Sequence, residues 1–301
     1  MASSPRPFDL GDLHSLPLVH LVSAGEPLRV GQVHRAWRGM VQTPGSVEMS
    51  IPVVLKYLPE QPKLAIELAC SLASAVFKLR VPRGMLVLAD RTLLPGLPAD
   101  ALSVNERGEV LCFASALRWP DDTAERALEG DPAVTDYLWH RFCSTNDAAP
   151  TAAWDELVAN PDRHTGNFIY DGVRYWLIDH ELSLKPLADS IRRMAEAAVR
   201  QAVIEHKAER NQVAAQLVER RPDDHGILDQ VQPFESKKRA LQGLEVTMRT
   251  WKTGSMTIDG VLELAYVVMG GIILRLPPLG LQLTERLAKP GGSLQWTTSE
   301  G

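Results

Sequence analysis

The sequence contains few cysteines and no hydrophobic run long enough to span a membrane. Its three cysteines, Cys70, Cys112 and Cys143, are an odd number without paired spacing, so we predict reduced, buried thiols. The most apolar stretch, residues 264–274, is far shorter than the roughly 20 residues of a membrane-spanning helix. We interpret it as a buried core helix. The N-terminus lacks the apolar core of a secretory signal, so we expect a cytoplasmic protein without membrane partners.

A strong charge of either sign is also missing. The 301 residues carry a formal net charge of -5, with 23% charged and 45% hydrophobic residues, which is typical of a soluble globular protein. This balance argues against a general nucleic-acid-binding protein, and we expect no direct contact with nucleic acid. The length allows one large domain or two lobes.

The N-terminal half also lacks a repeated glycine pattern of the kind that binds phosphates. The segment Ser23-Ala24-Gly25-Glu26-Pro27 could lie over phosphates in the manner of a glycine-rich loop, but it holds a single glycine. An ordinary turn is the simpler interpretation.

The order of strand and helix patterns predicts an α+β fold with two lobes and a cleft between them. The N-terminal lobe, residues 1–114, combines an antiparallel sheet with one helix, and the C-terminal lobe, residues 115–301, is helical apart from one hairpin. We expect a disordered tail from about residue 290. Strand patterns cover residues 18–23, 30–41, 49–57, 83–88 and 109–113. Helix patterns cover residues 62–79, 123–128, 132–144, 151–158, 186–203, 205–220, 233–251, 258–274 and 279–287.

One polar stretch stands out in the C-terminal half. It places three oxygen-bearing side chains, Asp162, Asn167 and Asp179, around a single predicted hairpin. Asp171-Gly172 between two β-rich runs is typical of a two-residue type I′ turn. With that turn, Asp179 would lie opposite His164. The hairpin would then bring Asp179 beside the loop that holds Asp162 and Asn167.

A second polar position lies in the third strand, where apolar residues surround Lys56. An unpaired buried charge is costly, so this lysine must pair with an acid, hold an anion or reach solvent along its alkyl chain. Glu67, on the following helix, lies at the flank of the apolar stripe and could turn inward to pair with Lys56. Glu60, before that helix, is the alternative partner.

Together these residue types meet the requirements of phosphoryl transfer. Mg²⁺ prefers oxygen ligands, whereas a carboxylate facing a phosphate at about 4 Å is repelled by about 4 kcal/mol at an effective dielectric near 20. Such a site therefore needs a divalent metal and a cation such as Lys56. The chain order of lysine, glutamate, Asp-x4-Asn and Ile-Asp matches a phosphate-binding lysine, its partner, a base for the acceptor hydroxyl and two Mg²⁺ ligands.

The hairpin region also resembles a known family. Asn160-Pro161-Asp162-Arg163-His164-Thr165-Gly166-Asn167 and Leu177-Ile178-Asp179-His180-Glu181 are similar to the catalytic segment of HipA-like serine/threonine kinases, a branch related to the phosphoinositide kinases. The resemblance implies a bilobal protein-kinase-like fold, ATP and Mg²⁺ as cofactors, and a serine or threonine of a protein as acceptor. An antitoxin-like partner is a further expectation from the family.

The same resemblance implies roles for single residues. Asp162 would be the catalytic aspartate, while Asn167 and Asp179 would bind Mg²⁺. Lys56 matches the nucleotide-binding lysine and Glu67 its partner. The strand residues Phe113, Ala114 and Ser115 resemble the hinge, whose backbone would meet the adenine. Asp179 is followed by His-Glu where eukaryotic protein kinases have Phe-Gly, so an activation-segment switch of that type is not expected.

Three alternatives remain open at the level of sequence. His164 and His180 with Asp162 and Asp179 could form a two-metal hydrolase site, although no His-x-His or His-x-x-x-His spacing supports it. A pseudokinase would bind nucleotide without transferring phosphate. A small-molecule or lipid kinase would use a similar Asp-x4-Asn loop, but aminoglycoside phosphotransferases usually have His-Gly before this aspartate, where this chain has Asn160-Pro161.

Overall fold

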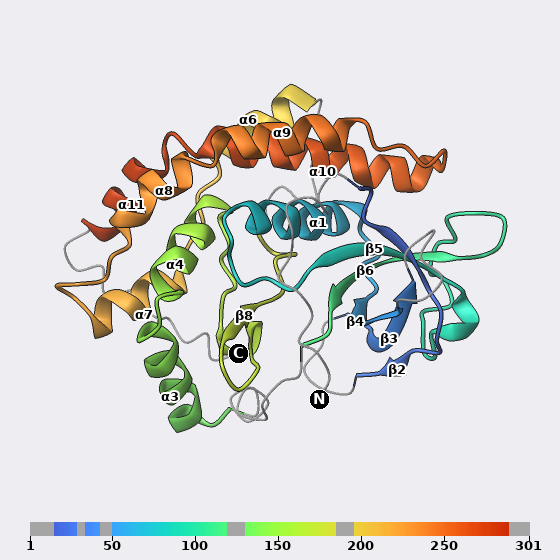
Figure 1. Ribbon diagram of the computed structural model, residues 1–301, viewed down its shortest axis with the longest axis horizontal. Coiled ribbons are helices and arrows are strands. Elements are labelled where there is room, and N and C mark those ends of the chain that lie inside the picture. Colours follow the sequence, from blue (N-terminus) through green and yellow to red (C-terminus); the bar gives the residue numbers. More distant parts are fainter. Residues whose placement is uncertain (1–14, 29–33, 43–49, 119–129, 185–195, 289–301) are drawn as a thin grey trace.

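The N-terminal half of the protein is a strand-rich unit with one long helix. We analysed a computed structural model, which describes residues 15–28, 34–42, 50–118, 130–184 and 196–288. Six strands form one sheet (Figure 1): β1 (Leu18–Leu21), β2 (Glu26–Pro27), β3 (Ala36–Gln42), β4 (Ser50–Lys56), β5 (Gly84–Ala89) and β6 (Val110–Ala116). Helix α1 (Gln61–Val76) follows β4 and has Pro62 in its first turn, where the missing N–H costs no helical hydrogen bond.

The sheet closes on itself because β1 pairs with strands on both of its sides. The strand order is β1-β5-β6-β4-β3-β2, and β1 also pairs with β3. The predicted antiparallel pairing is correct except between β1 and β5, which are parallel. Alternate residues point into the closed sheet, as the period of two in a strand requires. The buried interior consists mainly of Val19, Leu21, Trp37, Val41, Val53, Leu55, Met85, Val87, Val110, Cys112 and Ala114.

This alternation sets the direction of Lys56. Its neighbour Leu55 points into the closed sheet, so Lys56 points to the opposite face. Lys56 is the direct cross-strand partner of Phe113 on β6, and Phe113 packs in the core that contains α1. Lys56 therefore lies on the side of the sheet that faces α1.

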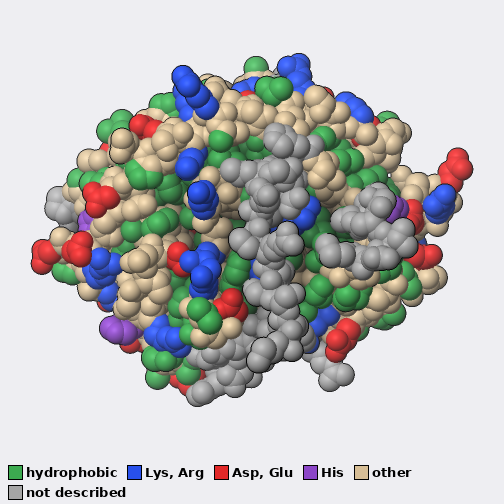
Figure 2. All heavy atoms as spheres, in the orientation of Figure 1, with side chains coloured by type: hydrophobic (Ala, Val, Ile, Leu, Met, Phe, Trp, Pro, Cys, Tyr) green, Lys and Arg blue, Asp and Glu red, His purple; other side chains and the backbone are tan. Residues whose placement is uncertain are grey.

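The C-terminal half is helical apart from a short hairpin. The strands of that hairpin are β7 (Phe168–Tyr170) and β8 (Tyr175–Leu177). The helices are α3 (Pro132–Cys143), α4 (Ala148–Leu157), α6 (Glu196–Glu205), α7 (Gln212–Arg220), α8 (Val231–Glu235), α9 (Lys238–Arg249), α10 (Met256–Arg275) and α11 (Leu279–Leu287). Basic and acidic side chains are interspersed over the described face in Figure 2.

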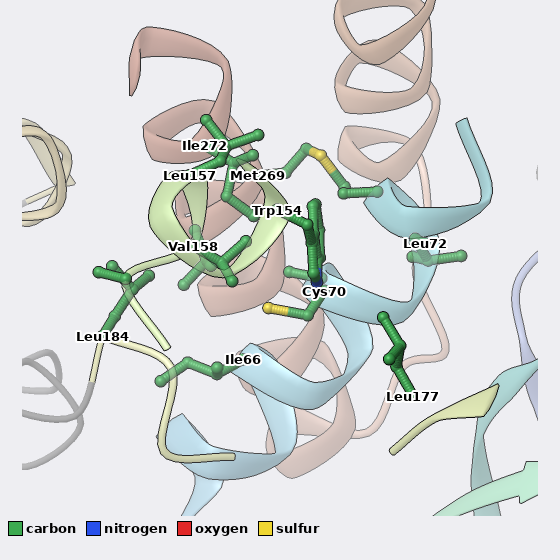
Figure 3. Close-up of a cluster of buried hydrophobic side chains, with 14 of the residues drawn as sticks. Ile66, Cys70, Leu72, Trp154, Leu157, Val158, Leu177, Leu184, Met269 and Ile272 are labelled. Carbon is green, nitrogen blue, oxygen red and sulfur yellow. The ribbon is translucent and has the colours of Figure 1, made fainter. Parts of the chain in front are cut away.

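One hydrophobic core joins the two halves. Helix α10 packs against α1, α6 and α9, so α1 lies between the sheet and α10 (Figure 1). Figure 3 shows Cys70 of α1, Trp154 of α4 and Ile272 of α10 in the same cluster. The three cysteines are free and buried, as predicted.

Helix α10 is long and apolar enough to cross a membrane by length and composition, which is more than the sequence pattern suggested. Most of its apolar window is buried inside the protein, however, against α1 and its helical neighbours. The interpretation of residues 264–274 as part of a buried core helix is therefore confirmed.

The predicted turn of the hairpin is wrong. Phe168 pairs with Leu177 and Tyr170 with Tyr175, and the backbone N–H of Asp171 donates to the carbonyl oxygen of Arg174, so the turn is centred on Gly172-Val173, one residue later than predicted. The Asp171 Oδ1 atom accepts hydrogen bonds from the backbone N–H groups of Val173 and Arg174, and this side-chain bonding favours the turn at Gly172-Val173. The register shifts by two residues, so that Asp179 lies beyond the paired strands.

Some predictions fall outside the described residues. The helix at 123–128 and the tail from about 290 belong to this group, and of the helix at 186–203 only the part from residue 196 is described. The lobe boundary at 114/115 lies within β6, and the division into two lobes stays a prediction.

The burial of α10 can be tested by two substitutions on the same helix. Val268 is fully buried, whereas Leu274 is 41% exposed. We expect Val268→Lys to lower the free energy of unfolding by at least about 3 kcal/mol, because it buries an unpaired charge. Leu274→Lys should cost less than about 1 kcal/mol. Urea denaturation measures both, and equal losses would contradict this placement of α10.

Candidate active site

Two carboxylates hold the ammonium group of Lys56. Its Nζ atom lies 2.8 Å from Asp179 Oδ1 and 2.8 Å from Glu181 Oε2. Burial alone would lower the pKa of Lys56, but Asp179, Glu67 and Glu181 outweigh it and raise the pKa above its ordinary value. The lysine of the third strand, more than a hundred residues upstream, therefore meets the end of the hairpin, and the predicted proximity of Lys56 and Asp179 is confirmed.

Glu67 turns inward, as predicted, but its partner differs from the prediction. Its side chain is buried, and Glu67 Oε1 accepts a hydrogen bond of 3.1 Å from the backbone N–H of His180. The ion pairs of Lys56 are made to Asp179 and Glu181 instead. Burial raises the pKa of Glu67 to about 8, although the charge of Lys56 acts in the opposite direction. The expected Lys56–Glu67 ion pair is therefore wrong, because the segment after β8 brings two closer acids.

Glu181 is an ionised acid in the same cluster. Burial would raise its pKa, but the nearby His34 and the charge of Lys56 lower the pKa to about 2. Within the described residues, Glu67, Asp179 and Glu181 form a group whose ligand atoms all lie within 4.8 Å of one another. Asp179 has the most accessible side chain of the three, at 33% exposed. Carboxylates gathered in this way can hold a divalent cation.

The backbone at Asp179 turns sharply. Its φ of 61° lies in the left-handed region, which aspartate tolerates better than most residues. Because of this turn, the Asp179 carboxylate accepts a hydrogen bond from Lys56, whereas the backbone N–H of the next residue, His180, donates to Glu67.

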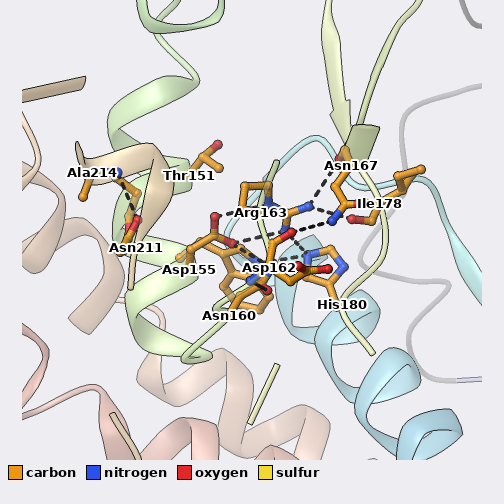
Figure 4. Close-up of polar contacts among 12 residues, drawn as sticks. Thr151, Asp155, Asn160, Asp162, Arg163, Asn167, Ile178, His180, Asn211 and Ala214 are labelled. Atoms are coloured by element: carbon orange, nitrogen blue, oxygen red, sulfur yellow. Dashed lines mark hydrogen bonds and ion pairs between the residues drawn. The ribbon is translucent and has the colours of Figure 1, made fainter. Parts of the chain in front are cut away.

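The loop that carries Asp162 is built on a buried arginine, Arg163 (Figure 4). Its Nε and Nη2 atoms bind the two carboxylate oxygens of Asp155 on α4, at 3.2 and 3.1 Å. Its Nη1 atom donates to the backbone oxygens of Asn167 and Ile178, at 3.3 and 2.6 Å. One guanidinium therefore connects α4, the start of the hairpin and its end, which uses the fork geometry of arginine fully.

His180 completes this network as a neutral ring. Its Nε2 atom faces the N–H groups of Trp154 and Arg163, at 3.2 and 3.1 Å. Two donors at one ring nitrogen require that nitrogen to be an acceptor. Burial lowers the pKa of His180 well below its usual value, and the charges of Arg163 and Lys56 add to the effect. With Nε2 occupied, His180 is a structural residue, which disfavours the two-metal hydrolase alternative.

Asp162 and Asn167 are fixed through the loop backbone. Asn160 Oδ1 accepts from the N–H of Asp162 at 3.0 Å, and Asn167 Nδ2 donates to the carbonyl oxygen of Asp162 at 2.7 Å. The carboxylate of Asp162 remains 35% exposed, with Arg210 Nη2 4.0 Å away. The amide nitrogen of Asn167 is used, so its oxygen is the atom left for a further ligand.

The structure changes the expected role of the hinge residues. Phe113, Ala114 and Ser115 lie inside β6, paired with β4 on one side and β5 on the other, so their backbone groups serve the sheet and are not free for an adenine. The side chains of Phe113 and Ser115 instead line a small cavity together with Glu67 and Asp179. The part of the prediction that relied on free backbone groups is therefore wrong, and contact with adenine stays a prediction.

Sequence reasoning missed Glu181, Asp155 and His34. Glu181 follows Asp179 at a spacing of two residues in a segment without regular structure, so no periodicity placed it. Asp155 lies on α4 at the helix face nearest the loop, and an acid eight residues before a buried arginine was the available signal. His34 lies between β2 and β3, with Nε2 3.1 Å from Glu181 Oε1.

Comparisons with known proteins support the fold alone. No family model and no curated protein matches the chain. Among solved structures, the chain is similar to the Helicobacter pylori proinflammatory kinase CtkA, at 10% sequence identity and a TM-score of 0.50. The match covers 89% of this chain and 99% of that one. The protein therefore has a mixed α and β fold, strand-rich in its N-terminal region and helical in its C-terminal region, that resembles a kinase.

The Arg163 network predicts a large effect on stability. Removing one partner of a buried ion pair leaves the other charge uncompensated. We expect Arg163→Ala to lower the free energy of unfolding by about 3–5 kcal/mol. Arg210→Ala, at a half-exposed arginine near the same loop, should cost less than about 1 kcal/mol. Denaturant titration of the two variants measures the difference, and similar losses would show that Arg163 does not hold the loop.

The raised pKa of Glu67 predicts a pH dependence of stability without divalent metal. Between its ordinary pKa near 4.5 and about 8, the folded protein keeps a proton that the unfolded chain has lost. The free energy of unfolding should therefore fall as pH rises through this window, by at most about 1.4 kcal/mol per unit from this group. Glu67→Gln should reduce the slope. Denaturation at several pH values with a chelator tests this, and identical slopes would contradict the burial of a protonated Glu67.

Proposed function

We propose that this protein is an ATP- and Mg²⁺-dependent kinase that transfers the γ-phosphate to a hydroxyl group. The observation that carries the proposal is the 2.8 Å contact between Lys56 Nζ and Asp179 Oδ1. It joins a lysine from the sheet to the aspartate that follows the hairpin, which is the pair that holds phosphates and metal in phosphoryl transfer. The likeness of the fold to a kinase supports the same class of reaction.

The residues present fit magnesium and a nucleotide. Asp179 supplies an accessible carboxylate, and Asn167 supplies an amide oxygen whose nitrogen is already bonded to Asp162; these are the hard oxygen ligands that Mg²⁺ prefers. When bound, ATP with Mg²⁺ supplies the phosphoryl group and neutralises charge on its oxygens. Lys56 would exchange its contact with Asp179 for the phosphates.

Asp162 is placed to accept the proton of the acceptor hydroxyl. Its backbone is held at two points, while its carboxylate remains partly exposed. In the transfer, a bond forms between the acceptor oxygen and the γ-phosphorus, and the bond from that phosphorus to the bridging oxygen of ADP breaks. The proton of the hydroxyl passes to the Asp162 carboxylate, which orients the nucleophile.

We further propose membership of the HipA-like serine/threonine kinases, with a protein serine or threonine as acceptor and a cytoplasmic location. The support is the sequence around Asp162 and Asp179, and Asn160-Pro161 in place of the His-Gly of aminoglycoside phosphotransferases. An antitoxin-like protein remains the proposed partner.

The test is phosphate transfer from γ-labelled ATP in the presence of Mg²⁺. We expect Asp162→Ala and Asp179→Ala to lower the rate by at least about a hundredfold, because each removes a group that contacts the reacting atoms. Asp224→Ala, at an aspartate whose side chain is 87% exposed and takes no part in the site, is the matched control and should retain most activity. Nucleotide binding by equilibrium dialysis separates loss of transfer from loss of binding.

Three outcomes would contradict the proposal. Equal label transfer in the wild type and in both aspartate variants would exclude Asp162 and Asp179 from the reaction. Binding of ATP without transfer to proteins or small molecules, under several divalent metals, would favour a pseudokinase. Ester hydrolysis without ATP would favour a metal-dependent hydrolase.

A further inference from the structure

Lys56 has two acidic partners. In the proposed reaction only one of them keeps its contact with Lys56 while the other binds metal. Asp179 and Glu181 both lie 2.8 Å from Nζ. If the proposed function is correct, Asp179 turns to the metal, and it is the more exposed of the two acids. The side chain of Glu181 is only 6% exposed, so it is enclosed by protein.

Glu181 has a neighbour at each of its oxygens. Oε2 contacts Lys56 on β4, and Oε1 lies 3.1 Å from Nε2 of His34. His34 precedes β3 by two residues, and Ala36 at the start of β3 is the cross-strand neighbour of Lys56. The carboxylate therefore lies between two adjacent strands of the sheet and the segment after β8, and the hydrogen bond from Lys56 sets its orientation.

Glu67 has a different task. Its Oε1 atom accepts the backbone N–H of His180, and its Oε2 atom lies 3.9 Å from Nδ1 of the same residue. Both oxygens of Glu67 thus face His180, which anchors the hairpin segment to α1. This leaves Glu181 as the enclosed acid in direct contact with the ammonium group.

We propose that Glu181 is the positioning residue for Lys56, in the place that the sequence assigned to Glu67. Glu181 holds the ammonium group toward the phosphate site while Asp179 is engaged by metal. The proposal rests on the proposed kinase function, but the contact itself exists without nucleotide. It can therefore be tested both with and without ATP.

The first experiment measures the reactivity of Lys56 without nucleotide. Limited acetylation followed by peptide mass spectrometry reports the rate at Lys56 in the folded protein. At pH 7, where Glu67 keeps its proton, we expect Glu181→Gln to raise that rate several-fold, because it removes an ion pair that protects the amine. Glu67→Gln replaces one neutral group by another and should leave the rate within about twofold. Glu60→Gln is the matched control, since it removes the acid 3.3 Å from Lys63 and should change the rate at Lys63 alone. A larger increase for Glu67→Gln than for Glu181→Gln would overturn the proposal.

The second experiment is a double-mutant cycle on the affinity for ATP with Mg²⁺. Glu181→Gln and Lys56→Met should each weaken binding by about tenfold, and the double variant should be no weaker than Lys56→Met, because residues that act through one contact are not additive. Additive losses would overturn the proposal. So would a loss that appears with Mg²⁺ and is absent for metal-free ATP, since it would make Glu181 a metal ligand.

Two further results complete the design. Should Glu181→Gln fail to fold, Glu181→Asp keeps the charge on a shorter side chain and is expected to raise the acetylation rate of Lys56 by a smaller factor; an unchanged rate would overturn the proposal. Absence of ATP binding by the wild type would contradict the proposed function, and the acetylation result would then still decide which acid holds Lys56.

Discussion

The cluster of one lysine and three carboxylates is the constraint on which the site depends. Like charges at about 4 Å repel by about 4 kcal/mol at an effective dielectric near 20. This repulsion acts within the cluster, because carboxylate oxygens of Glu67, Asp179 and Glu181 lie within 4.8 Å of one another. Lys56 offsets part of the repulsion, and a proton on Glu67 offsets more. One acid remains in excess at neutral pH. That residual negative charge, on the accessible Asp179, is what a divalent cation would neutralise.

The fold supplies this cluster through parts that are far apart in the sequence. Alternation along β4 points Lys56 toward α1, and α1 is fixed between the sheet and α10. Arg163 joins α4 to both ends of the hairpin, and this fixes the position of Asp179, the residue after Ile178. The buried polar network and the continuous core thus both hold the charged groups of the site in place, and catalysis requires such rigid positioning.

The sequence predicted those parts that depend on short-range chemistry. The Asp-x4-Asn and Ile-Asp segments, the inward-facing Glu67 and the apolar surroundings of Lys56 were all visible in local patterns. The hairpin register was not, because the side chain of Asp171 bonds two backbone N–H groups and favours a turn at Gly172-Val173 over one at Asp171-Gly172. Glu181 was missed because a left-handed residue at Asp179 redirects the chain. The backbone groups of the predicted hinge residues are not free, because β6 continues to Ala116 and pairs with a strand on each side, and the composition of a strand does not encode where its pairing ends.

The central claim is that the phosphates of a nucleotide meet Lys56 beside Asp179. An ATP derivative with a reactive acyl group on its terminal phosphate transfers that group to a lysine next to the phosphates, and peptide mass spectrometry identifies the lysine. The account predicts acylation of Lys56, abolished by excess ATP with Mg²⁺, while Lys63 on the neighbouring helix α1 is not protected by ATP. Acylation spread over surface lysines and unaffected by ATP, with Lys56 unmodified, would contradict it.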